Sequence, residues 1–142
     1  MSFLNKIKGL GSYIINRSKI IEEVLNELKD DIAEMNRQQM LRGETSKGGP
    51  ILPEYADSYL KTKRKLSQPS YVTLFKTGDF HSSIKTEVTR KRFELIATDE
   101  KTEKLLAKYG EDVLGLNDQN LKIIKDKIAD RLNSKFKEAI NV

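Results

Sequence analysis

The residues best suited to chemistry lie around His81, the single histidine of the chain, which is followed by two serines. A serine nucleophile needs a base within hydrogen-bond reach of its hydroxyl. Side chains one or two positions apart on a helical turn point in different directions, so His81 does not face Ser82 or Ser83. The pattern therefore predicts a structural histidine and no catalytic residue.

A metal or cofactor site is also not expected. With one histidine and no cysteine, a zinc site would need three carboxylate ligands. The acidic pairs Glu22-Glu23 and Asp30-Asp31 fall where a solvated helix face carries charge. The glycine-containing loop 43–52 follows a helix and lacks the spacing of a phosphate-binding loop. We therefore expect no metal, no cofactor and no enzymatic activity, with an enzyme kept as the last alternative.

Positive charge is concentrated in the middle of the chain. Residues 53–92 contain nine bases and four acids, which accounts for the whole net charge of +5. Positive charge concentrated in this way creates an electrostatic field that attracts phosphate groups or an acidic protein surface. A solvated helix face with no ligand explains the same charges. The residues that could face a DNA channel or a partner are Lys61, Lys63, Arg64, Lys65, Arg90, Lys91 and Arg92.

Two long amphipathic helices must position these residues. The first is predicted over 18–41, capped by Ser18 and ended by Gly43, because apolar residues recur at helical spacing from Ile20 to Met35. The second follows an Asn117 cap and runs to about residue 140. Shorter helices are predicted over 54–66 and 99–109.

A capped turn and a β-hairpin are predicted between the shorter helices. Thr77 has the hydroxyl of a helix N-cap, and Phe80 and Ile84 share one face of the turn that follows. Apolar or β-branched residues then alternate with polar ones, at Ile84, Thr86 and Val88 on one arm and at Phe93, Leu95 and Ala97 on the other. The turn at Arg90-Lys91 has no glycine or asparagine, so a wide or bulged turn is expected.

These elements predict one α+β domain over residues 1–142. A small antiparallel β-sheet would be covered on one face by the two long helices, with short extra helices. Residues 1–17 are expected to be mobile or ordered by a partner, and 43–52 to be a flexible loop. The apolar share of 37% is below the usual ~45–50%. This low share favours a subunit that completes its burial against neighbours.

The sequence predicts neither a membrane-spanning segment nor a signal peptide. No apolar run approaches the ~20 residues that cross a bilayer, and the start of the chain lacks the apolar region of a signal peptide. We expect a soluble protein that is made in the cytoplasm and does not contact membranes.

Three motifs, taken in order, resemble one family. The middle motif is Leu74, Thr77, Gly78, Phe80, Ser83 and Ile84; the upstream one is Gly48-Gly49-Pro50 followed by Tyr55, Tyr59, Thr62 and Lys63; the downstream one is Gly110, Leu114, Gly115 and Leu116. In this order they resemble the phage virion-morphogenesis proteins, also called tail-completion or head–tail joining proteins. The chain lacks the family's upstream Trp and has Glu111-Asp112-Val113 where Pro and Arg often stand.

The resemblance implies a structural role. Family members are understood to assemble as rings in the neck of a tailed phage, so it implies a virion protein that completes the tail or joins head to tail. The implied partners are further copies of the chain, head-connector or portal-side proteins, and tail-tube or tail-terminator proteins, with non-specific contact to passing DNA. The alternative, from charge alone, is a small basic nucleic-acid-binding module.

Overall fold

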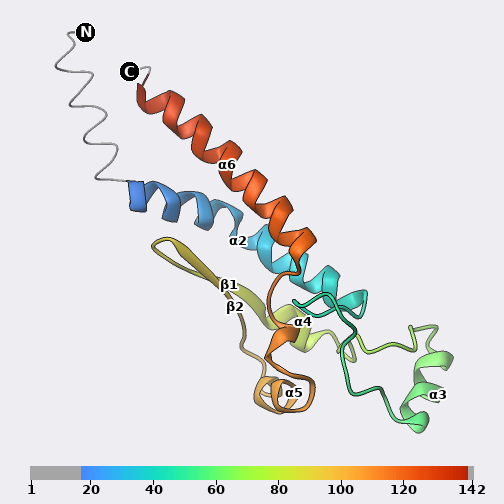
Figure 1. The fold of residues 1–142 in the computed structure, drawn as a ribbon. Helices are drawn as coiled ribbons and strands as arrows, with labels where there is room; N and C mark the ends of the chain where they lie inside the picture. The colour runs from blue at the N-terminus through green and yellow to red at the C-terminus, as the bar shows by residue number, and fades with distance from the viewer. Residues whose placement is uncertain (1–16, 141–142) are drawn as a thin grey trace, which may run out of the picture.

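The computed structural model describes residues 17–140 and confirms an α+β fold (Figure 1). The predicted mobility of residues 1–17 falls almost entirely outside the described residues. The predicted N-cap Ser18 is wrong, because Ser18 already lies within α2, which the structure describes from Arg17. The elements in chain order are α2 (Arg17–Leu41), α3 (Asp57–Lys65), α4 (Asp79–Ser83), β1 (Ile84–Thr89), β2 (Arg92–Ala97), α5 (Thr102–Tyr109), a 3-10 turn (Glu111–Val113) and α6 (Asp118–Ile140).

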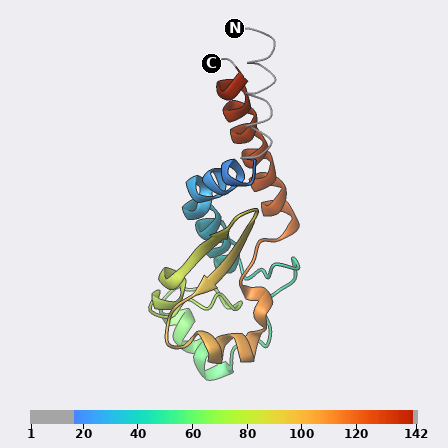
Figure 2. The ribbon, with the colours of Figure 1, turned by 90° about the vertical axis from the view of Figure 1, so that its left-hand side faces the viewer.

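Helix α2 is the middle layer of the fold. The β1–β2 hairpin packs on one side of it and α6 on another, as the two views show (Figures 1 and 2). The expected sheet and long helices are present. The expectation that both long helices cover the sheet holds for α2 only, because α6 packs on α2 instead. This layering follows from the sequence of α2, whose apolar residues cover more than one helix face.

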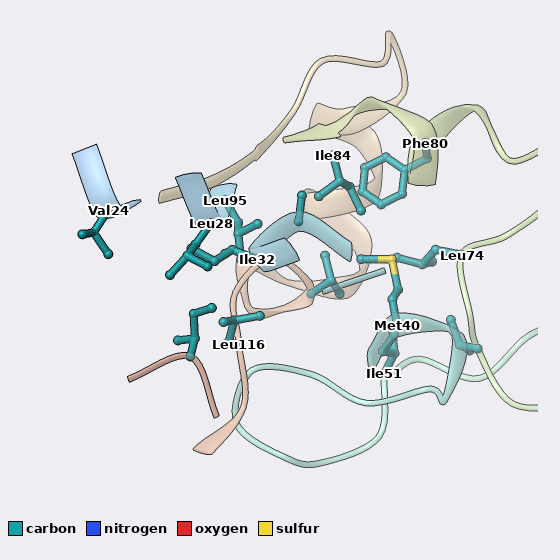
Figure 3. Close-up of a cluster of buried hydrophobic side chains, with 14 residues drawn as sticks. Val24, Leu28, Ile32, Met40, Ile51, Leu74, Phe80, Ile84, Leu95 and Leu116 are labelled. Carbon is teal, nitrogen blue, oxygen red and sulfur yellow. The ribbon is translucent and has the colours of Figure 1, made fainter. Parts of the chain in front are cut away.

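The core runs along α2 and continues into the segments around the hairpin (Figure 3). Val24, Leu28 and Ile32 of α2 are essentially inaccessible to solvent, as is Ile124 of α6. The predicted helical stripes therefore face the core. The other buried members of this cluster are Ala33, Met40, Ile51, Val72, Leu74, Phe80, Ile84, Leu95, Val113 and Leu116.

Ion pairs border the contact between α2 and α6. Arg131 Nη1 lies 2.9 Å from Glu27 Oε2, and Lys135 Nζ lies 3.0 Å from Glu27 Oε1 and 3.8 Å from Glu23 Oε2. The hydrogen bond from Lys135 holds the pKa of Glu27 below its ordinary value. Because these side chains are partly or fully exposed, the ion pairs contribute little to the stability of the helix contact.

The hairpin turn is tighter than the sequence predicts. Thr89 pairs with Arg92 in the antiparallel ladder, so Arg90 and Lys91 form a two-residue turn. The expectation of a wide or bulged turn is therefore wrong. The strand register requires the tight turn, and Arg90 adopts a φ of +49° to make it, although left-handed backbone costs a non-glycine residue about 1–2 kcal/mol.

This strain leads to a first prediction. Arg90→Gly should raise the free energy of unfolding by about 0.5–1 kcal/mol, because glycine adopts a positive φ without a steric penalty. Lys91→Gly is the matched control, since no positive φ is found at Lys91, and it should lower the stability. Urea denaturation of both variants measures the difference. A loss of stability in Arg90→Gly would contradict the prediction.

The loop after α2 is closed by backbone hydrogen bonds, although its composition predicts a flexible loop over 43–52. Thr45 N–H donates to Gly49 O at 2.8 Å, and Ile51 N–H donates to Gly43 O at 3.0 Å. The loop also reaches the segment before α6, where Ser46 N–H donates to Asp112 O at 2.8 Å. The backbone N–H and C=O groups of the loop are thus hydrogen-bonded, which the glycine content of the loop does not indicate.

The chain then leaves the body as an excursion, residues 52–71, between the buried residues Ile51 and Val72. Helix α3 begins at Asp57, not near residue 54, since residues 53–56 are extended or irregular after a cis Leu52–Pro53 peptide. The excursion lies beside α5, away from α6 (Figures 1 and 2). We call it the α3 excursion.

Candidate functional site

The middle motif forms a turn that leads directly from α4 into β1. Gly78 is the N-cap of α4 and has a φ of +87°. A Cβ at this position would lie 3.2 Å from the Phe75 ring, so the turn favours glycine here. The sequence predicts Thr77 as the N-cap, but Thr77 lies one residue earlier, where its hydroxyl accepts the Asp79 N–H at 3.3 Å.

The other motif residues hold this turn in the core. Phe80 and Ile84 are buried, which agrees with the shared face expected of them. Ser83 Oγ donates to Phe80 O at 2.8 Å and accepts the Thr98 N–H at 3.3 Å. Ser83 therefore joins α4 to the segment that follows β2.

Thr73 connects the α3 excursion to the segment that enters the motif. Its N–H donates to Tyr55 Oη at 3.1 Å, and its hydroxyl lies 3.4 Å from Lys63 Nζ. Leu74 N–H donates to the same tyrosine oxygen at 3.0 Å. Leu74 has a φ of +57°, which is an outlier for a bulky residue. The contacts from the α3 excursion thus hold a strained stretch of backbone in place.

His81 is a buried structural residue. Its Nε2 lies 2.7 Å from Thr73 O, and since a carbonyl only accepts, Nε2 carries the proton. The rings of Phe75 and Phe80 meet it edge-on. Burial lowers the pKa of His81 most strongly; nearby Arg37 also lowers this pKa, while the Thr73 bond and Glu34 raise it.

This burial predicts a specific pH dependence. The unfolded chain takes up a proton on His81 below about pH 6.5, whereas the folded protein binds it only at lower pH. Stability is therefore full above pH 6.5 and falls as the pH drops toward the folded pKa, by at most about 1.4 kcal/mol per pH unit. Chemical denaturation from neutral to mildly acidic pH measures this slope.

The control for this prediction is His81→Gln, which keeps an amide donor for Thr73 O but does not titrate. Because His81 is the single histidine, the slope should disappear in this variant. Glu27 and Glu34 have lowered pKa values, so their effects begin only at more acidic pH. An unchanged slope in His81→Gln would show that another group is responsible.

A pocket of about 310 Å³ lies against the motif turn, between the α3 excursion and α5. We call it the motif pocket. Its apolar wall comes from Tyr55, Tyr59, Leu74, Phe80, Leu105 and Tyr109. Charged side chains of both signs also line it, namely Lys76, Asp79, Asp99, Lys101 and Lys108. This arrangement suits an apolar side chain or a small apolar group from outside.

The downstream motif is held by buried amides of α2. Gly115 N–H donates to Asn36 Oδ1 at 3.0 Å, and Asn36 Nδ2 donates to Val113 O at 3.1 Å. Gly115 has a φ of +131°, and a Cβ there would lie 3.0 Å from Ser46 Cβ. Asn36 therefore binds the backbone before α6 much as a neighbouring strand would.

Gln39 extends this row of amides by one turn. Its Nε2 donates to Gly115 O at 2.9 Å, while its Oε1 accepts the Asn117 N–H at 2.8 Å and Asn120 Nδ2 at 3.0 Å. Asn117 Oδ1 in turn accepts the Asn120 N–H at 2.9 Å, which confirms the predicted cap of the last helix. We call Asn36, Gln39, Asn117 and Asn120 the amide clamp.

The remaining residues of the downstream motif have simpler roles. Gly110 is the C-cap of α5. Leu114 packs half-buried against the core, close to buried Leu116. The downstream motif therefore ends one helix and delivers the chain to the start of α6.

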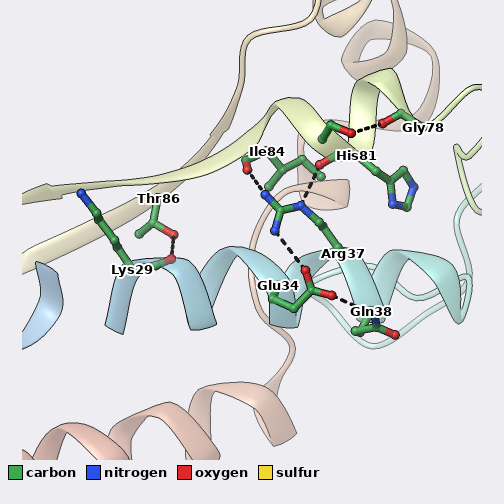
Figure 4. Close-up of polar contacts among 9 residues, drawn as sticks. Lys29, Glu34, Arg37, Gln38, Gly78, His81, Ile84 and Thr86 are labelled. Atoms are coloured by element: carbon green, nitrogen blue, oxygen red, sulfur yellow. Dashed lines mark hydrogen bonds and ion pairs between the residues drawn. The ribbon is translucent and has the colours of Figure 1, made fainter. Parts of the chain in front are cut away.

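Arg37 is another residue of α2 that fixes the middle motif (Figure 4). Its Nε donates to His81 O at 2.8 Å and its Nη2 donates to Ile84 O at 2.5 Å. Glu34 Oε2 lies 3.1 Å from Nη1. One guanidinium thus binds both the middle of α4 and the start of β1.

Lys63 does not join the exposed basic residues. It is 1% exposed, and its Nζ lies 4.6 Å from the ring centre of Tyr55 and 5.6 Å from that of Tyr59. Among the described side chains no carboxylate forms an ion pair with it. Its assignment to a surface facing DNA or a partner is therefore corrected, because the two aromatic rings enclose the ammonium group.

The other bases of that assignment are exposed but separated. Lys61, Arg64 and Lys65 lie on α3, whereas Arg90, Lys91 and Arg92 lie at the hairpin tip. Both views place α3 and the hairpin tip far apart on the molecule (Figures 1 and 2). The chain therefore presents two basic clusters, not one continuous strip.

Two features of the site are not predicted from the sequence: the amide clamp and Arg37. A signal was present, since Asn36 and Gln39 continue the α2 stripe four and seven residues after Ile32. Polar residues in core positions need buried partners, and their partners here come from a distant segment. Among residues 17–140 there is no group of three or more side chains that could hold a metal ion.

Comparisons of this chain with family models, with curated proteins and with solved structures find no match. Across the described helices, none is long and apolar enough to cross a membrane.

Proposed function

We propose that this chain is a structural virion protein of a tailed bacteriophage, a subunit of a ring in the neck that completes the tail or joins head to tail. The order of the three sequence motifs suggests the family. The observation that carries the proposal is the α3 excursion, which exposes Leu52 by 54%, Leu66 by 62% and Tyr71 by 50%. Three of the five large apolar side chains exposed in the described chain lie in this one segment, and exposed apolar surface gathered in one place supports binding to other proteins.

The proposed mechanism is assembly. The amide clamp and Arg37 hold the body together, while the α3 excursion and the motif pocket offer surfaces for neighbours. The expected partners are further copies of the chain, a portal-side protein, and a tail-tube or tail-terminator protein. A ring closes when the contact joins two different surfaces and its rotation returns to the start.

Native mass spectrometry and negative-stain electron microscopy of the purified chain test this proposal. We expect closed rings with a central opening at high protein concentration, or on addition of purified tail tubes. A chain that stays monomeric at every concentration and does not bind tail tubes would overturn it.

The two exposed basic clusters favour a second candidate, a sequence-independent nucleic-acid-binding module. Each phosphate contact contributes about −0.9 to the slope of log affinity against log salt. Under this candidate, replacing Lys61, Arg64 and Lys65 by Gln should make the slope shallower by up to about three. Lys63→Gln is the control and should leave the slope unchanged, because Lys63 is buried. A chain with no salt-dependent affinity for random duplex DNA would exclude this candidate.

A further inference from the structure

The exposed face of α2 is acidic. Glu23, Glu27, Asp30 and Glu34 recur at intervals of four, three and four residues, which places them on one side of the helix. Asp31 follows Asp30 and is also exposed. The three glutamates already contact bases of the same copy. Among the described side chains, however, Asp30 and Asp31 form no ion pair, so their charges remain available to a partner.

A groove of about 270 Å³ lies beside this face, between α2 and α6. We call it the α2/α6 groove; its lining comprises Asp31, Glu34, Met35, Gln38 and Arg42 of the α2 side and Asn120 and Lys127 of α6. Ile123, 42% exposed, lies three residues from Asn120 and four from Lys127, and so borders the same side of α6. Arg42 pairs with Glu44 at 3.6 Å. The groove therefore combines Met35 and the adjoining Ile123 with an edge where Asp30 and Asp31 form no ion pair; besides Arg42, Lys127 is the cation of its lining.

The α3 excursion has the complementary properties. Lys61, Arg64 and Lys65 are exposed, and Leu66, directly after the helix, is the most exposed of the large apolar side chains described. Helix α3 lies apart from α6 in both views (Figures 1 and 2), and no residue of 52–71 lines the groove. The two surfaces therefore do not meet within one copy.

We infer that the α3 excursion of one copy docks into the α2/α6 groove of a second copy. Leu66 enters beside Met35 and Ile123, and the bases of α3 face Asp30 and Asp31. This inference rests on the proposed function, because it names the contact that builds the ring. Two different surfaces of one chain make a head-to-tail contact, the type that generates rings or filaments.

Charge reversal with rescue tests the pairing in the full-length chain. Reversal of α3 (Lys61→Glu, Arg64→Glu, Lys65→Glu) should weaken self-association about tenfold or more, because like charges then face each other. Reversal of the groove edge (Asp30→Lys, Asp31→Lys) should weaken it similarly. Combining the two sets should restore association to within about threefold of wild type. Sedimentation velocity over a concentration series gives the association constants.

The matched control reverses the hairpin tip (Arg90→Glu, Lys91→Glu, Arg92→Glu), which changes the net charge as much as the α3 reversal does. It should leave self-association unchanged. Leu66→Asp tests the apolar part of the contact and should weaken association although all the bases of α3 remain. Thermal unfolding of each variant checks its folding, since exposed substitutions should leave the Tm close to that of wild type.

The outcomes separate this inference from the proposed function. Rings that form equally well in the α3 and groove reversals would overturn the pairing and leave the proposed function standing. Failure of the combined variant to recover, or loss of association in the hairpin-tip control, would also overturn the pairing. A wild-type chain that never self-associates, yet binds tail tubes, would do the same.

Discussion

Gln39→Ala should lower the free energy of unfolding by about 4 kcal/mol, because it removes several buried hydrogen bonds at once. Gln39 is fully buried and its side chain makes three hydrogen bonds, to Gly115, Asn117 and Asn120. Its removal leaves those buried groups without partners, at about 1–3 kcal/mol for each unsatisfied group. Urea denaturation of the variant measures the loss.

The neighbouring glutamine provides the control for this prediction. Gln38 is exposed and hydrogen-bonds Glu34 on the surface of α2. Gln38→Ala should change stability by no more than about 0.5 kcal/mol. Hydrogen exchange adds a local readout, since the Asn117 amide should lose protection in Gln39→Ala alone. Equal stability losses in the two variants would show that the clamp does not hold the fold together.

Arg37→Lys should lower the free energy of unfolding by about 2 kcal/mol, although it conserves the charge. The guanidinium of Arg37 binds His81 O and Ile84 O at once through two of its nitrogens. A lysine ammonium is a single point donor and does not reproduce this fork. One carbonyl at the junction of α4 and β1 would then lose its partner, and the same urea denaturation measures the cost.

Arg42→Lys is the matched control, because Arg42 is exposed and lies 3.6 Å from Glu44. It should cost less than about 0.5 kcal/mol in this experiment. A fully stable Arg37→Lys would mean that water replaces the lost hydrogen bond, and the role given to Arg37 would be wrong.

The helices and strands could be predicted from the sequence because their apolar residues recur at the spacing of a helix or of a strand. The stripe from Val24 to Ile32 and the alternation after Ile84 directly encode one helix face and one strand face. The α+β class and both strands of the hairpin followed from these periods. The tight turn at Arg90 did not, since strand register overrode the local preference for glycine or asparagine.

The candidate site was harder to predict because its contacts join distant parts of the chain. Lys63 stands four residues after Tyr59, on the same face of α3, whereas Lys61 and Lys65 point elsewhere. The spacing from Tyr59 indicated that Lys63 could be buried, yet the run of bases around Lys63 suggests an exposed basic patch. The separation of the two basic clusters depends on the tertiary fold, which no local pattern contains.

The amide clamp also has a consequence for how the protein is made. Gln39 finds its partners 76, 78 and 81 residues later in the chain. While the ribosome is still adding residues before Val113, Asn36 and Gln39 of α2 have none of their partners from the downstream segment. Folding must therefore wait until residues 113–120 have been synthesised, and a nascent chain stalled before that point would expose its central helix to chaperones and proteases.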